Sequence, residues 1–348
     1  MKSMKNFSST EILGISKPEK LFLCSTEQEL KLCYRKLSAL WHPDKHISDG
    51  INTSDVFAHI QVLYEKAIVR INSGDWNKGN IFRVLDEVGK EFEIKYESQV
   101  PFEFGSCYIG RGIVAWSFIK AEEEFAKRAI KNIESLKFAN NKMKEEVKKN
   151  IPEIFKLIKS KNETILVLTK DKDSISLVDV LSYYKGFVDP KHVAWILSGM
   201  YNLACFNQYN QLMSASFSLN NYFINPEQHS GQLIGGWWFA CHQGEKLTAL
   251  STNAIDVAPI KMINKKIADI KLDLELIKLV GRQLLGDASG MNLKKDSRIP
   301  KPLVEWLNDV SSYMPFEAYD IWQNKVLRES FGVRRFTKMD LTINDIYN

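Results

Sequence analysis

The chain has 348 residues, of which 45% are hydrophobic and 26% charged, enough to build a large core and to favour two domains. Its net charge of only +5 argues against a strongly basic nucleic-acid binder and against an acidic disordered tail. The 5 cysteines are scattered without a Cys-x-x-Cys pair, so neither a disulfide framework nor a cysteine zinc site is expected. Without a long apolar run or a recognisable signal peptide, the sequence predicts a soluble, cytoplasmic protein.

The first part of the chain has the pattern of a small helical hairpin with a polar loop at its tip. Apolar residues recur at helical spacing in the two longer segments, and Pro43 disfavours continuation of the first of them. The predicted helices are a short one near Thr10–Leu13, one that runs from a cap at Ser25 or Thr26 to Trp41, and one over Ser54–Ile71, with the polar loop at Ile47–Thr53.

A basic helix followed by a His-Pro-Asp tripeptide is the most informative motif. The basic residues are Lys31, Arg35, Lys36 and Lys45, and the tripeptide is His42-Pro43-Asp44. Pro43 restricts the loop, and the side chains of His42 and Asp44 offer hydrogen bonds. With this motif between two helices, Glu11–Ile71 resembles the J domain of DnaJ-type co-chaperones. The resemblance implies that the basic face docks on an acidic surface of a DnaK-type chaperone ATPase and that the loop couples docking to ATP hydrolysis.

The segment also departs from the J-domain pattern. The link between the first two helices, Ser16–Cys24, is longer than usual, and no basic fourth helix is evident after Ile71. The Gly/Phe-rich linker and zinc-binding cysteine repeats of full DnaJ proteins are absent from the sequence. The alternative interpretation is a purely structural hairpin, in which His42 only ends a helix and the lysines form a solvated face.

After residue 80 the pattern changes to strands and then to helices. Glycines separate the strand-like runs, a charged helical stretch follows, and most of the chain after Leu177 reads as helical. The predicted strands are Ile81–Leu85, Phe92–Tyr96, Phe102–Ile109, Ile113–Ile119 and Ile165–Leu168. The predicted helices are Glu122–Phe138 and Asn141–Lys159, the latter kinked near Pro152, and a strand-loop-strand region covers Tyr222–Ala240.

In its order of elements this larger region resembles a protein kinase. The long helix at His192–Tyr209, the segment Ser214–Ile224, the Gly235-Gly236 pair and the apolar helix opened by Asp273 follow in the order of a kinase second lobe. Together with the hairpin, this gives a multidomain fold: an all-α J domain at 1–78, then an α+β two-lobed domain. Its first lobe, with a helical insertion, covers 79–170, and its helical second lobe covers 171–348.

The resemblance implies a pseudokinase, because the residues that phosphoryl transfer requires are replaced. In this register Ser216 stands for the catalytic aspartate, Gly235 for the metal-binding aspartate and Ser117 for the phosphate-binding lysine. Asn221 survives at the position of the metal-binding asparagine, and Lys120 lies near the lysine position. No catalytic residue, metal or cofactor is therefore expected. The alternative interpretation is an unrelated α+β domain.

The remaining candidates are expected to be structural. The histidines His192, His229 and His242 have no ligand spacing, Cys33 is expected to be buried without a redox role, and Trp237 and Trp238 are expected to follow a core turn.

Three functions compete. The favoured one is a co-chaperone that stimulates a DnaK-type ATPase, with the kinase-like domain as a non-catalytic adaptor that binds an unknown client, and with no membrane or nucleic-acid partner. The second is an atypical nucleotide-binding enzyme or kinase that uses Lys120 and Asn221. The third is a scaffold in which the hairpin is only an interaction module.

Overall fold

A computed structural model describes residues 8–22, 27–43, 53–72, 80–310 and 312–347. The protein is of mixed α+β type and divides into two compact units. The first lies within residues 1–83 and includes 93–97, and the second comprises 84–92 and 98–347. None of the described helices combines the length and apolar character that crossing a membrane requires.

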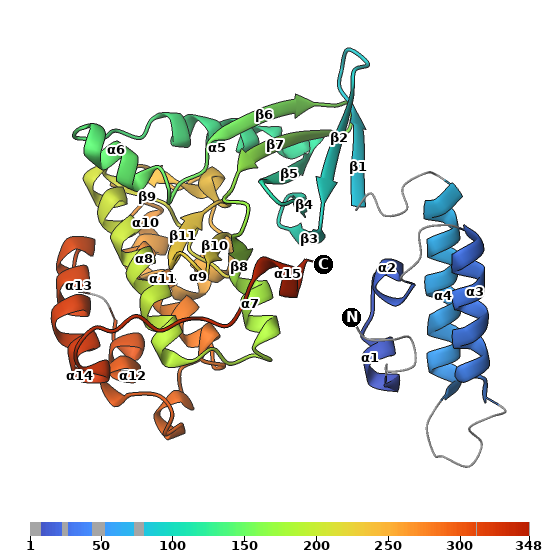
Figure 1. The fold of residues 1–348 in the computed structure, drawn as a ribbon. Coiled ribbons are helices and arrows are strands. Elements are labelled where there is room, and N and C mark those ends of the chain that lie inside the picture. Colours follow the sequence, from blue (N-terminus) through green and yellow to red (C-terminus); the bar gives the residue numbers. More distant parts are fainter. Residues whose placement is uncertain (1–7, 23–26, 44–52, 73–79, 311, 348) are drawn as a thin grey trace. The chain divides into compact units, whose positions relative to one another are not determined.

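The first unit is mainly helical, with residues 80–83 and 93–96 in strand conformation, and the three predicted helices are confirmed. Its elements are α1 (Ser9–Leu13), α2 (Pro18–Leu21), α3 (Glu27–Leu40) and α4 (Thr53–Asn72). Helices α3 and α4 pack side by side (Figure 1). Leu30 and Leu37 on α3 are buried with Ile60 and Leu63 on α4, as the helical spacing predicts.

Helix α2 was not predicted, and it explains the long link after α1. Pro18 occupies the first turn, where its missing N–H costs nothing and its fixed φ favours a helix. The short helix brings Leu21 and the following Phe22 into the hairpin core, where both are fully buried. The extra residues of the link therefore add to the core.

A five-stranded antiparallel sheet begins the second unit. Its strands are β3 (Ser98–Phe102), β4 (Gly105–Ile109), β5 (Ile113–Ile119), β6 (Ile154–Lys159) and β7 (Glu163–Thr169), in the order β3-β4-β5-β7-β6. Between β5 and β6 the chain forms α5 (Glu123–Glu134), which packs against β5 and β7, and α6 (Asn141–Val147). A separate two-stranded sheet, β1 (Asn80–Leu85) and β2 (Glu91–Tyr96), precedes this one in the chain.

Two predictions for this region were wrong in part. The predicted helix Asn141–Lys159 ends at Val147, and β6 follows Pro152 and pairs with β7. The proline cannot continue a helix, and pairing with β7 satisfies the backbone of the next residues. The predicted strand Phe102–Ile109 is confirmed only from Gly105 on, as β4; Phe102 ends β3, and the hairpin turn lies between them. Gly105, at the start of β4, has a φ of 152° that side-chain-bearing residues rarely adopt.

Helices dominate the rest of the second unit, with short strands between them. The helices are α7 (Leu177–Tyr183), α8 (Pro190–Tyr209), α9 (Thr252–Val257), α10 (Ile260–Lys265), α11 (Lys271–Leu284), α12 (Lys301–Asn308), α13 (Pro315–Ile321), α14 (Leu327–Phe331) and α15 (Ile343–Ile346). The strands are β8 (Ile175–Ser176), β9 (Leu212–Met213), β10 (Tyr222–Asn225), β11 (Ser230–Leu233) and β12 (Cys241–His242).

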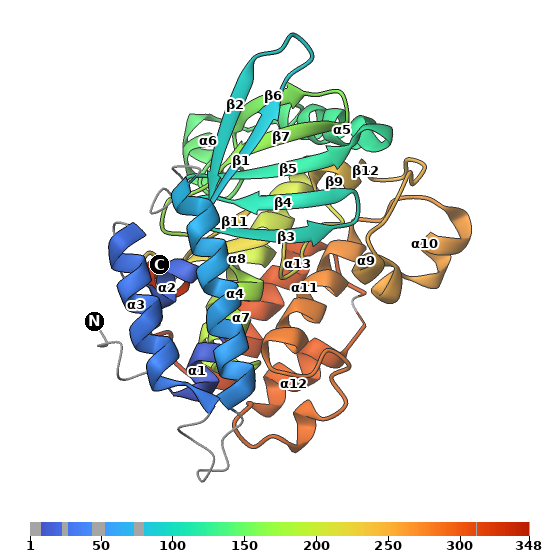
Figure 2. The same cartoon turned by 90° about the vertical axis from the view of Figure 1, so that its right-hand side faces the viewer.

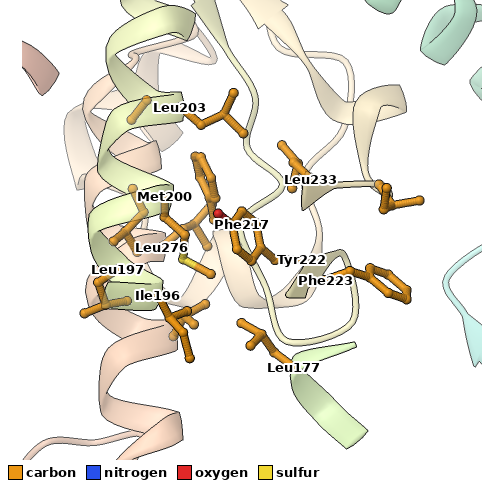
Figure 3. Packing of buried hydrophobic residues seen from close by; sticks show 14 of the residues in the cluster. Leu177, Ile196, Leu197, Met200, Leu203, Phe217, Tyr222, Phe223, Leu233 and Leu276 are labelled. Atoms are coloured by element: carbon orange, nitrogen blue, oxygen red, sulfur yellow. The ribbon is translucent and has the colours of Figure 1, made fainter. Parts of the chain in front are cut away.

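Helix α8 forms the centre of this core. In Figure 3, Ile196, Met200 and Leu203 of α8 lie beside Phe217, in the segment before β10, and Tyr222, the first residue of β10. All five side chains are almost completely buried. The segment between β9 and β10 is therefore held from one side by the central helix.

The last described residues fold back onto the second unit. Tyr347, which is 3% exposed, donates a hydrogen bond from its hydroxyl to Asp179 on α7. Arg111, in the turn between β4 and β5, donates to the Asn344 side chain at 3.1 Å and to the Tyr347 carbonyl at 3.0 Å. This segment thus ties the five-stranded sheet to the helical part of the unit.

Candidate functional site

The exposed face of α3 carries the basic residues of the predicted docking surface. Lys31, Arg35 and Lys36 are all exposed, on the side opposite the buried residues of the helix. Lys31 Nζ lies 2.5 Å from Glu27 Oε1, and this hydrogen bond and charge raise the pKa of the lysine. Because Glu27 partly neutralises Lys31, Arg35 and Lys36 carry most of the positive potential of this face.

The His-Pro pair follows α3 directly. Trp41 is buried at the end of the helix, which fixes the point where the chain leaves it. The exposed His42 ring meets the Phe57 ring of α4 edge to face, with centroids 5.7 Å apart. Pro43 is half-buried, while Asp44 and Lys45 lie outside the described residues. The structure therefore brings His42 and Pro43 to the end of the basic helix and leaves the rest of the predicted loop untested.

The hairpin that presents this surface is held together by packing between its helices. The Tyr34 ring of α3 stacks on the Tyr64 ring of α4, with centroids 4.0 Å apart. His59 of α4 makes a hydrogen bond of 2.8 Å to the Ile15 carbonyl beyond α1. These contacts hold α3 against the other helices of the unit, so that its exposed face has a fixed position.

In the second unit, three of the four predicted positions come together. Asn221 donates from Nδ2 to the Ser216 carbonyl at 3.1 Å, and its own carbonyl accepts from the backbone N–H of Gly235 at 3.2 Å. The Ser216 hydroxyl donates to the Gly236 carbonyl at 2.7 Å. Hydrogen bonds to the backbone thus occupy the Ser216 hydroxyl and the Asn221 amide.

Ser117 does not join this group, and its neighbour Trp116 does. The Ser117 hydroxyl donates to Glu163 on β7. Successive residues of a strand face opposite sides, and the Trp116 ring lies over Gly235, where an added Cβ would be 2.5 Å from Trp116 Cζ2. In the structure Ser117 therefore points away from Gly235, and Trp116 is the residue of β5 that lies against it.

Trp116 belongs to a cluster of aromatic rings between the sheet and the segment after Gly236. We call it the aromatic cluster; its members are Phe102, Phe104, Trp116, Phe118, Phe125, Trp238 and Phe239. The Trp116 and Trp238 centroids are 4.9 Å apart, and Phe102 lies 5.0 Å from Trp116 and 5.4 Å from Trp238. Trp116 and Trp238 are each 1% exposed, so apolar rings fill the space beside Asn221 and Gly235.

Asn132 of α5 forms hydrogen bonds to the backbone of the segment after Gly236. Its side-chain amide donates to the carbonyl of Trp237 at 2.8 Å and to that of Ala240 at 3.1 Å. These two carbonyls flank the short 3-10 helix Trp237–Phe239. The residue is buried, and sequence analysis did not identify it because its partners lie more than a hundred residues away in the chain.

Asp273, near the start of α11, binds the backbone of the two residues that precede Ser216. Its carboxylate accepts hydrogen bonds from the backbone N–H groups of Ser214 at 3.0 Å and Ala215 at 2.8 Å. The Ser214 hydroxyl and Asn207 Nδ2 also donate to it, at 3.0 and 3.3 Å. Complete burial raises the pKa of Asp273 to about 6, although these hydrogen bonds favour the charged form. The available sequence signal was an aspartate between two leucines, Leu272 and Leu274, at the start of an amphipathic helix, since a buried carboxylate requires partners.

The other candidate residues do not form a site among the described residues. His229 is stacked between Trp195 and Phe336, with centroids 4.5 and 4.2 Å away, and burial lowers its pKa. Cys33 is buried as expected. Nowhere in the described ranges do three or more His, Cys, Asp or Glu side chains gather in a way that could hold a metal ion.

Comparison with known proteins identifies no relative: no family model matches the chain, and no curated protein matches it.

Replacing Gly235 tests how closely the aromatic cluster packs on it. A Cβ at this position would lie 2.5 Å from Trp116 Cζ2 and closer still to Asn221 Oδ1. We expect Gly235→Ala to lower the free energy of unfolding by about 1–3 kcal/mol. Gly235→Asp should cost more, because it also places a carboxylate among apolar rings. Denaturant unfolding measures both, with Gly112→Ala as the control, since a Cβ there makes only an ordinary contact of 3.8 Å. Equal losses at the two glycines would contradict this packing.

Asp273 predicts a specific pH dependence of stability. Its pKa is about 6 in the folded protein, against about 3.9 in an unfolded chain. Because the pKa is higher in the folded protein, Asp273 makes a stabilising contribution to the free energy of unfolding that is fully present below pH ~4. This contribution is lost as the pH rises through about 6. The free energy of unfolding of the wild type relative to Asp273→Asn should therefore fall by about 3 kcal/mol across that window. Chemical denaturation at several pH values tests this, and a difference that is constant or rises with pH would contradict it.

Proposed function

We propose that this protein is a J-domain co-chaperone, whose hairpin stimulates the ATPase of a DnaK-type chaperone and whose larger unit is a kinase-like, non-catalytic adaptor. The observation that carries the proposal is the placement of His42 and Pro43 directly after α3, on a helix whose Arg35 and Lys36 are exposed. A short loop beside a rigid cationic helix is suited to contact an acidic surface and to transmit that contact.

The order of elements in the larger unit supports the kinase-like part of the proposal. An antiparallel sheet has α5 inserted between its third and fourth strands, and the central helix α8 and the segment Ser214–Asn221 follow. The buried Asp273, whose carboxylate binds the backbone of Ser214 and Ala215, gives that segment a fixed support. This support goes beyond the sequence resemblance, which identified Asp273 only as the start of an apolar helix.

The residues beside Asn221 do not fit a magnesium-bound nucleotide. Magnesium requires carboxylate oxygens, and Gly235, at the expected metal-binding position, has no room even for a Cβ. Trp116 rather than Ser117 faces Gly235, so in this register a tryptophan takes the direction of the phosphate-binding lysine. Lys120 does not supply the missing charge, because its ammonium group binds Glu87 at 2.9 Å and Glu123 at 3.0 Å. These contacts favour an adaptor over the alternative of a nucleotide-binding enzyme.

Steady-state ATP hydrolysis by a DnaK-type chaperone tests the hairpin. We expect the wild-type protein to stimulate hydrolysis and His42→Gln to abolish the stimulation, because the substitution removes the imidazole that packs on Phe57 beside Pro43. Reversing the charge of Arg35 and Lys36 together should also abolish it, and more salt should weaken the wild-type effect.

His242→Gln is the matched control for this assay, because His242 is also exposed but lies on β12 of the other unit. Wild-type stimulation by His42→Gln would refute the proposed role of the loop. Absence of stimulation by the folded wild-type protein would refute the co-chaperone function.

A thermal-shift titration with magnesium and ATP tests the adaptor. We expect no change in melting temperature at millimolar nucleotide, because the Trp116 ring, packed against Phe102 and Trp238, lies against Gly235 next to the Asn221 side chain. An active protein kinase measured in parallel confirms that the conditions detect binding. A magnesium-dependent rise in melting temperature would favour the nucleotide-binding alternative instead.

A further inference from the structure

Between β12 and α11 lies a long connecting segment whose two ends are joined by backbone hydrogen bonds. Leu247 N–H donates to the Lys266 carbonyl at 2.9 Å, and Ala268 N–H donates to the Glu245 carbonyl at 2.8 Å. The segment contains α9 and α10, and α10 lies at an outer edge of the second unit in Figure 2. Ala254 and Met262 are buried and anchor the two helices. We call residues 248–267 the α9–α10 loop.

The α9–α10 loop exposes four isoleucines. Ile260 is 76% exposed and Ile255 56%, while Ile267 and Ile263 are 41% and 38% exposed. Ile260 and Ile263 are three residues apart on α10 and therefore share one face of the helix. Single exposed apolar residues are ordinary, but several within one short segment are typical of an interaction site.

Lysines surround these isoleucines. From Val257 to Ala268 the sequence contains Lys261, Lys265 and Lys266 and no acidic residue. All three are exposed, and none forms an ion pair with a carboxylate in the part of the chain that the structure describes. On the same unit, by contrast, Lys120 and Lys127 are held by glutamates at 2.9 Å. The loop as a whole also contains one exposed carboxylate, Asp256, beside Ile255. With three lysines against one acidic residue, it combines exposed apolar side chains with a net positive charge.

We propose that the α9–α10 loop is a docking surface for a short protein segment that combines apolar side chains with carboxylates. The positive charge selects an acidic partner, and the isoleucines supply the apolar contact. A surface centred on a six-residue helix is small beside the roughly 800 Å² per partner of a stable protein interface, which favours a short segment. A helix as short as α10 gives little area for stable insertion into a bilayer, so a protein segment is favoured over a lipid surface. The inference rests on the proposed adaptor function, since it assigns the surface that binds the client.

Fluorescence anisotropy with the full chain tests this surface. The probe is a labelled synthetic peptide with leucines at helical spacing and glutamates at the other positions, and a second peptide carries lysines in place of the glutamates. We expect only the acidic peptide to bind. Ile260→Asp should weaken its binding by on the order of tenfold or more, as should joint replacement of Lys261 and Lys265 by glutamate. An aspartate at position 260 is compatible with folding, because it begins α10, where a negative charge favours the helix.

Two exposed residues outside the loop provide matched controls. Val333→Asp introduces the same charge at a side chain that is 83% exposed, and Lys294→Glu reverses an exposed lysine. Both should bind the acidic peptide as the wild type does. Equal binding by all variants, or no binding by the wild type, would overturn the proposal. Binding to anionic phospholipid vesicles that Ile260→Asp abolishes, without peptide binding, would also overturn it and assign the surface to a membrane.

The same variants separate this inference from the function on which it rests. Ile260→Asp should stimulate the chaperone ATPase as the wild type does, because it leaves α3 and His42 unchanged. Peptide binding without any stimulation by the wild type would overturn the co-chaperone function and leave the docking surface supported. Stimulation without peptide binding would overturn the docking surface alone.

Discussion

The carboxylate of Asp273 is the interaction on which the helical part of the second unit depends. It is completely buried, and it binds the backbone of Ser214 and Ala215 where the chain would otherwise leave two N–H groups without acceptors. Ala215 has a φ of 52°, a conformation that costs energy for a side-chain-bearing residue and needs support from its surroundings. The carboxylate supplies that support, and the positions of Ser216 and Asn221 follow from it.

The aromatic cluster fixes the same segment from the side of the sheet. In the proposed kinase-like register, this is the region where an active phosphotransferase holds charged side chains, a metal and a nucleotide. Here Trp116 and Trp238 pack against each other, and Asn132 ties α5 to the backbone around Trp237. Dispersion and apolar burial thus join the sheet to the helices at this point. Such packing gives a rigid body, which suits the proposed adaptor role.

Local patterns predicted the parts of the molecule that depend on local forces. Helices α3 and α4 follow from their apolar spacing, and Pro43 marks the end of the first. By contrast, β6 reads as the continuation of a helix, because only its pairing with β7 makes it a strand. Periodicity identifies the residues of β5 but not which of its faces turns toward Gly235, so Trp116 was missed in favour of Ser117. The partners of Asp273 depend on contacts between distant segments, which no local pattern contains.

We propose that the hairpin engages the chaperone while the region around Asn221 stays closed to nucleotide. Hydrogen–deuterium exchange of the full chain, measured alone, with magnesium and ATP, and with the ATP-loaded chaperone, tests both parts at once. We expect the chaperone to slow amide hydrogen exchange along α3, and magnesium and ATP alone to leave amide exchange at 214–238 unchanged. Slower exchange at 214–238 with nucleotide alone, or an α3 unaffected by the chaperone, would contradict it.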